Sequence, residues 1–348
     1  MHAKTYKMIY PDDQEYYSLN NVLTYNADFN LIFSVRNLGK SYSARKIIAK
    51  SVKNGYKCCW FRWSINESQV AYEKFRDEYP EFTVEKTTMK NVKILADSES
   101  GGKIYFFAVK QAAGYKDCGI TDLRWVCYDE FVPEFYDVKT RRDVEFDKFM
   151  SLLISVKRDC NPRVLMIANC IDWFNPFCSR WQIFPFNQGE IKIFRKSMGM
   201  DGKIFEKTIL VENVKPTKAM VERVAEAEVL KGDAKSIEDY FKNATKYTYD
   251  LIEKCENRNI PLANVQFRKG EKYYSYRKYN GIFYFELCGK RNVPTECPDI
   301  MTIRKGEERT PEIGNQLQSM INRGIVRFDN GITYNDICNM IYKYRNRL

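Results

Sequence analysis

The sequence predicts an α/β domain with a mostly parallel sheet, then a small helical linker, then a basic C-terminal α+β domain. Three observations support this division. Residues 29–169 alternate apolar, strand-like runs with amphipathic ones, as a parallel sheet covered by helices requires. Charged amphipathic segments dominate from about residue 190 to residue 254, and strand-like alternation returns after them. We therefore place the domains at residues 1–190, 191–254 and 255–348.

Buried strands of the first domain are predicted from short apolar runs. Four such runs are FNLIFSV, KCCWFRW, LRWVCYDEF and RVLMIAN. A further segment, FTVEKTTMKNVKILADSESGGKIYFFAV, alternates with period two around a Ser-Gly-Gly turn. This alternation predicts a hairpin inserted beside the main sheet.

Helices between these strands are predicted from helical periodicity in SYSARKIIAKSVKNG, NESQVAYEKFRDEY and VEFDKFMSLLISVKR. Apolar residues about one or two turns apart form the inner faces of the first two: Ile47, Ile48 and Val52, then Val70, Phe75 and Tyr79. Gly55 lies just past the end of the first helix, where glycine is favoured.

The linker is predicted to contain two charged amphipathic helices, TKAMVERVAEAEVLKGD and SIEDYFKNATKYTYDLIEK. Strand alternation follows in VQFRKGEKYYSYRKYNGIFYFEL, with an Asn-Gly pair at residues 280–281 that favours a tight hairpin turn. The segment TYNDICNMIYKYRNR is predicted to form a final helix. These elements indicate a second, α+β domain.

The charge of the chain indicates a polyanionic partner. The 348 residues carry a formal net charge of +11, and residues 255–348 hold 16 Lys and Arg against 10 Asp and Glu. Nucleic acid is favoured over a membrane, because the sequence has no lipidation motif and no basic amphipathic helix beside an apolar anchor. With no signal peptide and no long apolar stretch, we expect neither secretion nor a membrane span.

The cysteines argue against a zinc site. Eleven of them are scattered without a C-x-x-C pair, and the chain has one histidine, His2. Cys58, Cys59 and Cys127 fall inside apolar runs, where a free cysteine acts as a small buried hydrophobe. Free buried thiols imply a reducing compartment.

A phosphate-binding loop is predicted at SVRNLGKSY. The usual pattern is G-x-x-x-x-G-K-[ST], and Ser34 stands where the first glycine belongs. A strand precedes the loop and a helix follows, so backbone N–H groups would cradle the phosphates of ATP, Lys40 would add its charge, and Ser41 would hold Mg²⁺. The predicted ATP-binding residues are Ser34, Val35, Arg36, Asn37, Leu38, Gly39, Lys40, Ser41 and Tyr42. A chance GKS in a lysine-rich chain is the alternative.

The complement of this loop is the strand RWVCYDEF, which ends in Asp129 and Glu130. Asp129 would hold Mg²⁺ through water, and Glu130 would polarise the attacking water as a general base. A solvated acidic turn is the alternative, but the pair follows a GKS with a strand between them, which favours a nucleotide site. That strand, KCCWFRW, and the second acidic residue indicate the motor-type (ASCE) division of P-loop NTPases rather than nucleoside kinases or GTPases.

Three further polar residues are candidates for catalysis. Asn169 follows the strand RVLMIA, where a sensor residue could hydrogen-bond the γ-phosphate or the water; capping the next turn is the alternative. Arg62 ends the second strand, and Arg158 lies in the loop VKRDCNPR, where it could reach a neighbouring subunit as an arginine finger. Each arginine could instead be an ordinary surface residue.

Together these motifs resemble the DNA-packaging ATPases of φ29-like bacteriophages, which are compact relatives of large terminases. The resemblance covers most of the chain and is carried by YYSLNNVLTYN, SVRNLGKSY, KNGYKCCWFRW, WVCYDEF, IANCIDWFNPF and NRGIVRFDN. The R-x-x-GKSY form from Arg36 to Tyr42 and the later G-x-x-RFDN from Gly324 to Asn330 are more particular than a generic P-loop. Ser34 departs from the glycine of the family.

The resemblance implies a homopentameric ATPase ring on the portal of a procapsid, pushing double-stranded DNA inward in the host cytoplasm. It leaves a structural RNA open as a partner, and it implies a C-terminal domain with an RNase H-like fold that has lost nuclease activity. The residues that match the family's site are Lys40, Ser41, Arg62, Asp129, Glu130 and Asn169. Arg158 falls in the segment that supplies the trans-acting arginine, with Lys157 and Arg163 as alternatives.

Contacts to DNA should favour the backbone over the bases, because packaging must tolerate any sequence. Candidate contacts around the predicted hairpin and before the acidic strand are Lys86, Lys90, Lys93, Lys103, Lys110 and Lys116. In the last domain, RKGEKYYSYRKYNGIFYF interleaves basic and aromatic residues, although most of the tyrosines are expected in the core. The late carboxylates are too dispersed for a nuclease: Asp299, Glu307, Glu308, Asp329 and Asp336.

Two other functions stay open at this point. One is another DNA translocase or helicase, which single-strand preference and unwinding would distinguish. The other is a non-catalytic protein that binds DNA or the portal and carries a degenerate nucleotide site. Ser34 favours the latter, whereas the complete set of Lys40, Ser41, Asp129 and Glu130 favours an ATPase.

Overall fold

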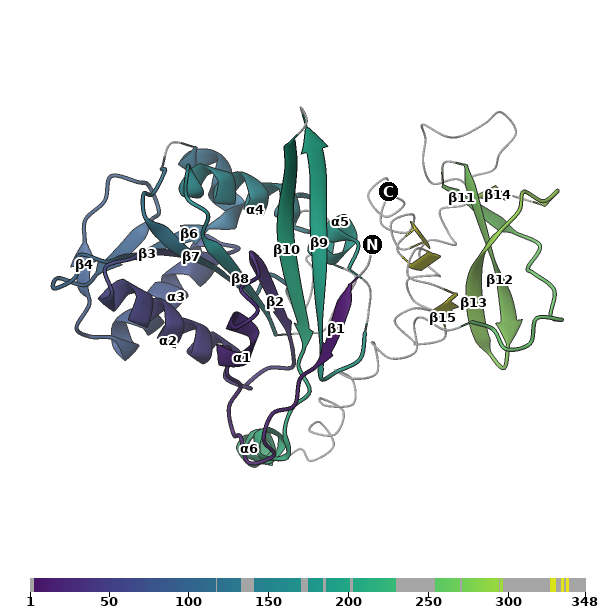
Figure 1. Ribbon diagram of the computed structural model, residues 1–348, viewed down its shortest axis with the longest axis horizontal. Helices are drawn as coiled ribbons and strands as arrows, with labels where there is room; N and C mark the ends of the chain where they lie inside the picture. The colour runs from purple at the N-terminus through teal and green to yellow at the C-terminus, as the bar shows by residue number, and fades with distance from the viewer. Residues whose placement is uncertain are drawn as a thin grey trace. The chain divides into compact units, whose positions relative to one another are not determined.

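The computed structural model divides into two compact units, residues 1–171 with 188–241 and residues 172–187 with 242–348. Each unit has its own sheet (Figure 1). The residues that the structure describes are 3–116, 118–132, 141–169, 175–183, 186–200, 203–229, 254–269, 271–293, 295–296, 326–329, 333–334 and 336–337.

The large unit is built on a ten-stranded sheet. Its strands are β1 (Lys4–Lys7), β2 (Phe29–Phe33), β3 (Lys57–Arg62), β4 (Thr83–Glu85), β5 (Lys93–Ala96), β6 (Lys103–Ala108), β7 (Leu123–Asp129), β8 (Arg163–Ala168), β9 (Glu190–Met200) and β10 (Lys203–Asn213). They lie in the order β1-β9-β10-β2-β8-β7-β3-β6-β5-β4. Neighbours from β10 to β6 are parallel, and the strands at both edges are antiparallel. The α/β class and the mostly parallel sheet are therefore confirmed.

Helices cover both faces of this sheet. The helices of the large unit are α1 (Asn20–Leu23), α2 (Lys40–Lys53), α3 (Ile65–Glu78), the 3₁₀ helix η1 (Val109–Tyr115), α4 (Arg141–Lys157) and α6 (Lys218–Val229). Figure 1 shows α2 and α3 on one face and α4 on the other. The three predicted helices between strands are confirmed.

One predicted contact of α3 is wrong, because Val70 is 51% exposed. The residues of this helix that are buried lie along a different stripe: Ser68, Ala71, Tyr72 and Phe75. The helix begins with a capping box, in which the Ser64 side chain accepts a hydrogen bond from the Glu67 N–H and the Glu67 carboxylate accepts one from the Ser64 N–H. Such a cap contributes about 1 kcal/mol and fixes where the helix begins.

The predicted hairpin is present, but it extends the main sheet instead of lying beside it. Strand β6 pairs in parallel with β3, with Cys59 opposite Tyr105, and β5 and β4 follow in antiparallel order. Since β6 takes part in both pairings, the hairpin forms one edge of the ten-stranded sheet.

Strands β9 and β10 correct the boundary expected at residue 190. Strand β10 pairs in parallel with β2, and β9 pairs antiparallel with β10 along its whole length. These residues were expected in a helical linker, but segments such as EIKIFRK alternate charged and apolar residues as a strand does. Helix α6 confirms the first predicted linker helix, and the second, SIEDYFKNATKYTYDLIEK, lies outside the described residues except for Lys254.

Aromatic side chains join the helices to the two strands that lie at the middle of the core. Trp60 of β3 meets Phe75 of α3 edge-on, with ring centroids 5.0 Å apart. Tyr128 of β7 stacks on Phe149 of α4 at 5.3 Å. All four side chains are at most 1% exposed. Contacts of this kind stabilise the core beyond their buried area, and here they join β3 to α3 and β7 to α4.

The predicted burial of three cysteines is confirmed. Cys58, Cys59 and Cys127 lie in β3 and β7 and are 0% exposed. Burial raises the pKa of the Cys58 thiol to about 12, so the group stays protonated and behaves as a small apolar side chain.

The small unit contains α5 (Pro176–Trp181) and a five-stranded sheet. Its strands are β11 (Gln266–Lys269), β12 (Lys272–Tyr279), β13 (Ile282–Cys288), β14 (Thr295–Glu296) and β15 (Val326–Phe328), in the order β14-β11-β12-β13-β15. Asn280 and Gly281 both have left-handed backbone, with φ of 47° and 78°, as a two-residue hairpin turn requires. The predicted Asn-Gly hairpin is therefore confirmed.

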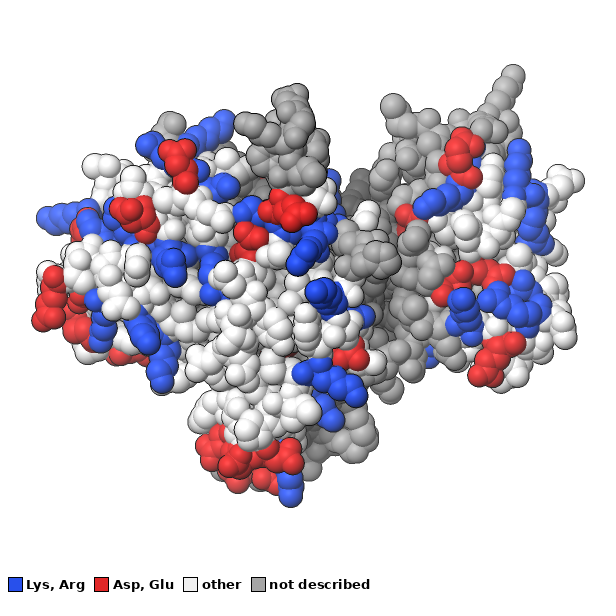
Figure 2. Space-filling view, in the orientation of Figure 1, with Lys and Arg blue, Asp and Glu red and all other residues white. Residues whose placement is uncertain are grey.

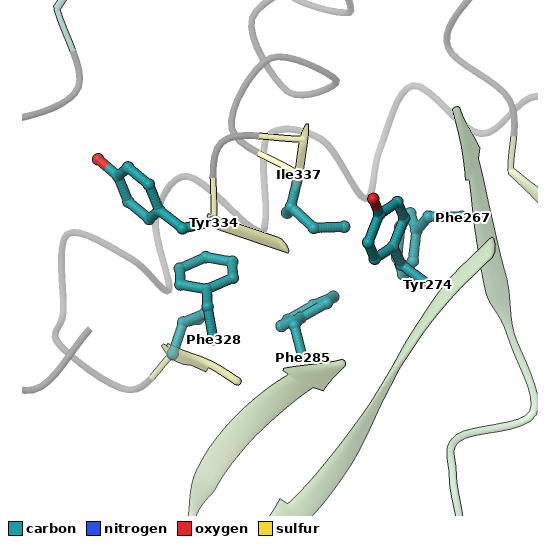
Figure 3. Packing of buried hydrophobic residues seen from close by; sticks show 7 residues of the cluster. Phe267, Tyr274, Phe285, Phe328, Tyr334 and Ile337 are labelled. Atoms are coloured by element: carbon teal, nitrogen blue, oxygen red, sulfur yellow. The ribbon is translucent and has the colours of Figure 1, made fainter. Parts of the chain in front are cut away.

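A cluster of buried apolar side chains covers one face of this small sheet (Figure 3). It consists of Phe267, Tyr274, Phe285, Val326, Phe328, Tyr334 and Ile337. The expectation that most tyrosines of the basic hairpin lie in the core agrees with Tyr273, Tyr274 and Tyr284, which are at most 9% exposed. Residues 333–334 and 336–337 are helical, and the rest of the predicted final helix lies outside the described residues.

Within the part of the chain that the structure describes, no helix combines the length and the apolar character needed to cross a bilayer.

Candidate active site

Four strands of the large sheet end beside one another at the same edge. Strands β2, β8, β7 and β3 are consecutive neighbours and parallel, so their carboxyl ends point the same way. The polar residues at these ends are Ser34 after β2, Asn169 after β8, Asp129 and Glu130 at β7, and Arg62 at β3. The strand between β2 and β7 is β8, whereas KCCWFRW, which separates them in the sequence, lies on the far side of β7. Carboxyl ends of parallel strands are where α/β folds bind ligands.

The predicted phosphate loop joins β2 to α2. Gly39 caps α2 with a φ of 92°, and Asn37 has a φ of 62°. A left-handed backbone suits glycine and is tolerated by asparagine. Among the described residues with positive φ, the loop contributes only these two, so Ser34 does not occupy a position that needs glycine. The missing first glycine therefore imposes no backbone strain.

The Lys40 side chain contacts the first two residues of the loop. Its ammonium group donates to the Ser34 hydroxyl at 2.6 Å and to the Val35 carbonyl at 2.7 Å, and the residue is 2% exposed. Ser34 is itself fully buried, and its hydroxyl donates to the Val35 carbonyl at 2.9 Å. The remaining predicted loop residues divide by exposure, with Val35 and Leu38 buried and Arg36, Asn37 and Tyr42 exposed.

The first turn of α2 meets the end of β7 through Ser41 and Asp129. The Ser41 hydroxyl donates to one oxygen of the Asp129 carboxylate at 2.9 Å, and Asp129 is 6% exposed. The two residues predicted to hold Mg²⁺ are thus adjacent. A hydroxyl and a carboxylate are hard oxygen donors of the kind that Mg²⁺ prefers.

Arg62 bridges both acidic residues. Its guanidinium donates to Asp129 at 2.9 Å and to Glu130 at 2.6 Å, and its side chain is 14% exposed. Burial alone would lower the pKa of Arg62, but the charges of Asp129 and Glu130 outweigh it and raise that pKa above its ordinary value. The arginine therefore holds two carboxylates together that would otherwise repel each other.

Glu130 is held at both oxygens. One accepts from Arg62, and the other accepts from the Asn169 amide at 2.9 Å. The backbone of Glu130 is left-handed, with a φ of 57°, and the N–H of Phe131 then donates to the Ile167 carbonyl at 3.2 Å. A non-glycine residue in this conformation costs of order 1 kcal/mol or more and is concentrated at functional sites. The side chain remains 34% exposed, so solvent can reach it.

Arg158 does not join this cluster in its own chain. It is exposed and precedes β8, so it lies toward the amino-terminal ends of the central strands, where it rests against Gly119. Of its two alternatives, Arg163 is engaged, since its guanidinium lies 4.8 Å from the Trp125 ring centroid and donates to the Leu23 carbonyl at 2.9 Å. The role of Arg158 or Lys157 toward a neighbouring subunit stays a prediction.

The predicted DNA-contacting lysines are not brought into the cluster. Lys86, Lys90, Lys93, Lys110 and Lys116 are exposed, whereas Lys103 is half-buried and forms an ion pair with Glu85 at 2.6 Å. Figure 2 shows basic and acidic side chains interspersed over this face of the large unit, with acidic ones gathered over α6. Their role in binding DNA stays a prediction.

A segment that the motifs do not mark also contacts the phosphate loop. It comprises residues 10–19 and is here called the strap. The Tyr17 N–H donates to the Leu38 carbonyl at 2.7 Å, and the Tyr16 ring lies against Gly39. Arg223 of α6 stacks on that ring, with 4.2 Å between its guanidinium carbon and the ring centroid. The paired tyrosines before the loop are the one sequence signal for this contact, and nothing in the sequence points to Arg223.

A buried carboxyl group of the sheet binds two tyrosines of the strap. Glu212 of β10 is 0% exposed and accepts hydrogen bonds from the hydroxyls of Tyr10 at 2.6 Å and Tyr17 at 2.5 Å. Burial raises the pKa of Glu212 to about 7, although both hydrogen bonds act in the opposite direction. The strap is therefore attached to the sheet one strand away from the phosphate loop.

No protein-family model and no curated protein match this chain. Among solved structures, it is similar to the Phi-28 gp11 DNA packaging motor, with a TM-score of 0.58, 13% identity, and coverage of 95% of this chain and 98% of that one. It is similar to the same degree to the bacteriophage Phi-29 viral genome packaging motor assembly. There the TM-score is 0.58 and the identity 15%, with coverage of 95% of this chain and 100% of that one. The chain therefore has the fold of these two phage proteins over nearly its whole length.

Proposed function

We propose that this chain is an ATP-hydrolysing motor that moves viral double-stranded DNA into a preformed capsid. The observation that carries the proposal is the cluster at the carboxyl edge of the large sheet, in which Ser41, Arg62, Asn169 and the acidic pair are joined by hydrogen bonds beside Lys40. The fold shared with two phage packaging motors supports DNA packaging as the work that hydrolysis drives, by analogy.

The phosphate loop would bind the phosphates of ATP. Gly39 is the N-cap of α2, and the N–H groups at the first turn of a helix attract anions. Lys40 is the first residue of that helix, so its ammonium group would add a full positive charge at the same place. The loop backbone and Lys40 would together select a polyphosphate.

Ser41 and Asp129 fit a Mg²⁺ site. The Ser41 hydroxyl oxygen and one Asp129 carboxylate oxygen are 2.9 Å apart, so both could contact one ion. When bound, Mg²⁺ neutralises charge on the phosphates during their transfer. Ser41 would hold it directly and Asp129 through water.

Glu130 is the proposed general base. The bonds from Arg62 and Asn169 fix the direction of its carboxylate, and its partial exposure leaves one side open to water. Glu130 would accept a proton from the attacking water, while Asn169 would hydrogen-bond the water or the γ-phosphate. Arg62 would keep the carboxylate in place.

Arg158 is the proposed trans-acting residue of a homopentameric ring bound to the portal in the host cytoplasm. Its exposed side chain precedes β8, at the opposite ends of the strands from the loop of its own chain. A nucleotide that it touches would therefore belong to a neighbouring subunit, as an arginine finger in trans requires.

The exposed lysines around β4, β5 and η1 are proposed to contact DNA through its phosphates. The small unit is proposed to be an RNase H-like domain without nuclease activity. Phosphate contacts depend on salt rather than sequence, so translocation should weaken with ionic strength and should not vary with base composition.

The test is ATP hydrolysis by the full chain with and without duplex DNA, repeated on procapsids that carry a portal. We expect duplex DNA to stimulate hydrolysis, Lys40→Ala to abolish it, and Lys46→Ala, an exposed lysine on the same helix, to leave it unchanged. Stimulation by single strands with unwinding would indicate a helicase instead. No hydrolysis on the portal would indicate a non-catalytic structural protein.

A further inference from the structure

The strap lies on the phosphate loop at several points. Besides the bond from Tyr17 to Leu38, the N–H of Leu19 donates to the Ser43 hydroxyl on α2 at 3.1 Å. A Cβ added to Gly39 would lie 3.2 Å from the Tyr16 ring, so the ring closely covers the glycine that begins α2. The strap is thus in contact with the loop backbone and with the start of the helix that follows it.

The strap is also fastened to α6. The Thr217 hydroxyl donates to the Gln14 carbonyl at 2.6 Å, and the Ala219 N–H donates to the Asp12 carbonyl at 3.2 Å. Figure 1 shows the N-terminal segment passing beside α6. Since the same short segment touches both, it connects the phosphate loop to this helix.

Arg223 makes this connection directly. Its guanidinium donates to the Asn37 carbonyl within the loop and to the Glu15 carbonyl within the strap, the latter at 3.1 Å. The same group stacks on Tyr16. Only the planar fork of an arginine can donate in two directions and stack at once, so lysine would not replace it.

These partners differ from those of an ordinary surface arginine. Arg45 forms an ion pair with Glu78, and Arg76 lies 6.0 Å from the Tyr72 ring on the exposed side of α3. The hydrogen-bond acceptors of Arg223 are backbone carbonyls, one of which belongs to Asn37, a residue with left-handed backbone. The contact therefore constrains loop geometry and is not a simple charge pair.

We propose that Arg223 is a positioning residue that holds the phosphate loop in its binding geometry and couples the loop to α6. This inference rests on the proposed binding of ATP by that loop. Helix α6 is the last element of the large unit that the structure describes, and in the sequence it precedes residues 242–348 of the small unit. Coupling free energies are reciprocal, so a nucleotide in the loop must stabilise α6 by as much as the Arg223 contact strengthens nucleotide binding.

The binding test is titration of the full chain with a fluorescent ATP analogue and Mg²⁺. Arg223→Ala and Arg223→Lys should each raise the Kd about tenfold, the loss of roughly one charged hydrogen bond and a stacking contact. Tyr16→Ala should act in the same direction, while Tyr16→Phe should stay within about twofold because the ring is kept. Arg76→Ala is the matched control and should leave the Kd unchanged.

At saturating ATP, the kcat of the Arg223 variants should stay within about threefold of wild type, because Arg223 does not touch the reacting groups.

Hydrogen exchange tests the coupling. ADP or the analogue should slow amide exchange in residues 218–229 of the wild type, and this protection should be lost in Arg223→Ala.

If the wild type binds nucleotide and both Arg223 variants bind equally well, or if α6 is not protected, the coupling is wrong while the proposed function stands. A lowered Tm with an unchanged Kd would show a purely structural role. If Arg223→Ala does not fold, Arg223→Lys and Tyr16→Ala decide the question. Absence of nucleotide binding by the wild type would overturn both proposals.

Discussion

Acidic side chains are held differently in the large and the small sheet. At the end of β7, the consecutive residues Asp129 and Glu130 share one cation, Arg62. In the small sheet, Glu286 lies within β13 and accepts hydrogen bonds from two arginines, Arg258 and Arg277. One arginine thus bridges two carboxylates at the large sheet, whereas one carboxylate accepts from two arginines in the small unit.

The topology of each sheet explains the difference. Parallel strands bring residues far apart in sequence to a common edge, where a helix N-terminus adds positive potential that tolerates excess acid. An antiparallel hairpin pairs residues close in sequence across one ladder, as with Arg277 and Glu286, so charge is neutralised locally. We infer that the first arrangement serves chemistry and the second serves stability.

Among the substitutions that compare the two sheets, Glu130→Gln should give the largest effect. It removes the proposed general base while keeping the shape of the side chain, so ATP turnover should fall by at least about 10²-fold. Turnover would be measured at saturating ATP with duplex DNA present. The matched change in the small sheet, Glu286→Gln, should leave turnover within about twofold and lower the stability of that unit, because two arginines lose their anionic partner. Equal turnover in wild type and Glu130→Gln would remove Glu130 from the mechanism, and a large loss in Glu286→Gln would contradict the comparison.

Glu212 extends the comparison to a carboxyl group that is bound by tyrosine hydroxyls. Its folded pKa, about 7, is raised above the ordinary 4.5, so the folded chain keeps a proton that the unfolded chain releases between these values. The stability it contributes is therefore complete below pH 4.5 and is lost as the pH rises through 7, a change on the order of 3 kcal/mol. Urea unfolding of the wild type and Glu212→Gln between pH 5 and 8 should show the wild type losing stability relative to the variant. A difference that does not depend on pH would show that Glu212 is ionised throughout.

The substitution Arg62→Lys should have a smaller effect on turnover. Lysine keeps the positive charge but cannot donate to Asp129 and Glu130 in the fixed geometry of a guanidinium. We expect kcat to fall about tenfold with a smaller change in KM, since a misdirected base weakens the transition state more than binding. Arg277→Lys is the counterpart in the small sheet and should leave kcat unchanged. A wild-type kcat in Arg62→Lys would mean that the second hydrogen bond does not orient Glu130.

Much of the large sheet could be predicted because its strands and helices have strong periodicity. The loop, the acidic pair, Arg62 and Asn169 could be found because each ends an apolar strand or follows one directly. Strands β9 and β10 were missed because they are separated from the strands they join by long stretches of sequence, and their charged residues suggested an exposed linker. Local sequence patterns do not predict pairing between strands that are far apart in the sequence.

The strap shows the same limit at the level of single residues. Glu212 lies in an apolar strand and Arg223 lies on a charged helix, and neither position has a motif that relates it to Tyr16 or Tyr17. Their contacts join residues about 200 positions apart, for which local periodicity carries no information. Sequence could identify the polar groups at the strand ends, but not the contacts that attach the strap to β10 and α6.

The substitution Ser34→Gly should have the smallest effect, with ATP turnover within a few-fold of wild type. Glycine would remove the hydroxyl that accepts from Lys40 at 2.6 Å, but the Val35 carbonyl at 2.7 Å remains. The backbone of Ser34 is not left-handed, so glycine relieves no strain and only makes the unfolded chain more flexible, at a cost of roughly 1 kcal/mol or less. The contrast is Gly39→Ala, where a φ of 92° strains any side chain and the added Cβ would lie 3.2 Å from the Tyr16 ring, so nucleotide binding should weaken strongly. A large gain in Ser34→Gly would show that serine impairs the loop, and a large loss would show that its hydroxyl is needed to direct Lys40. The two substitutions therefore distinguish position 39, where the loop backbone requires glycine, from position 34, where it does not.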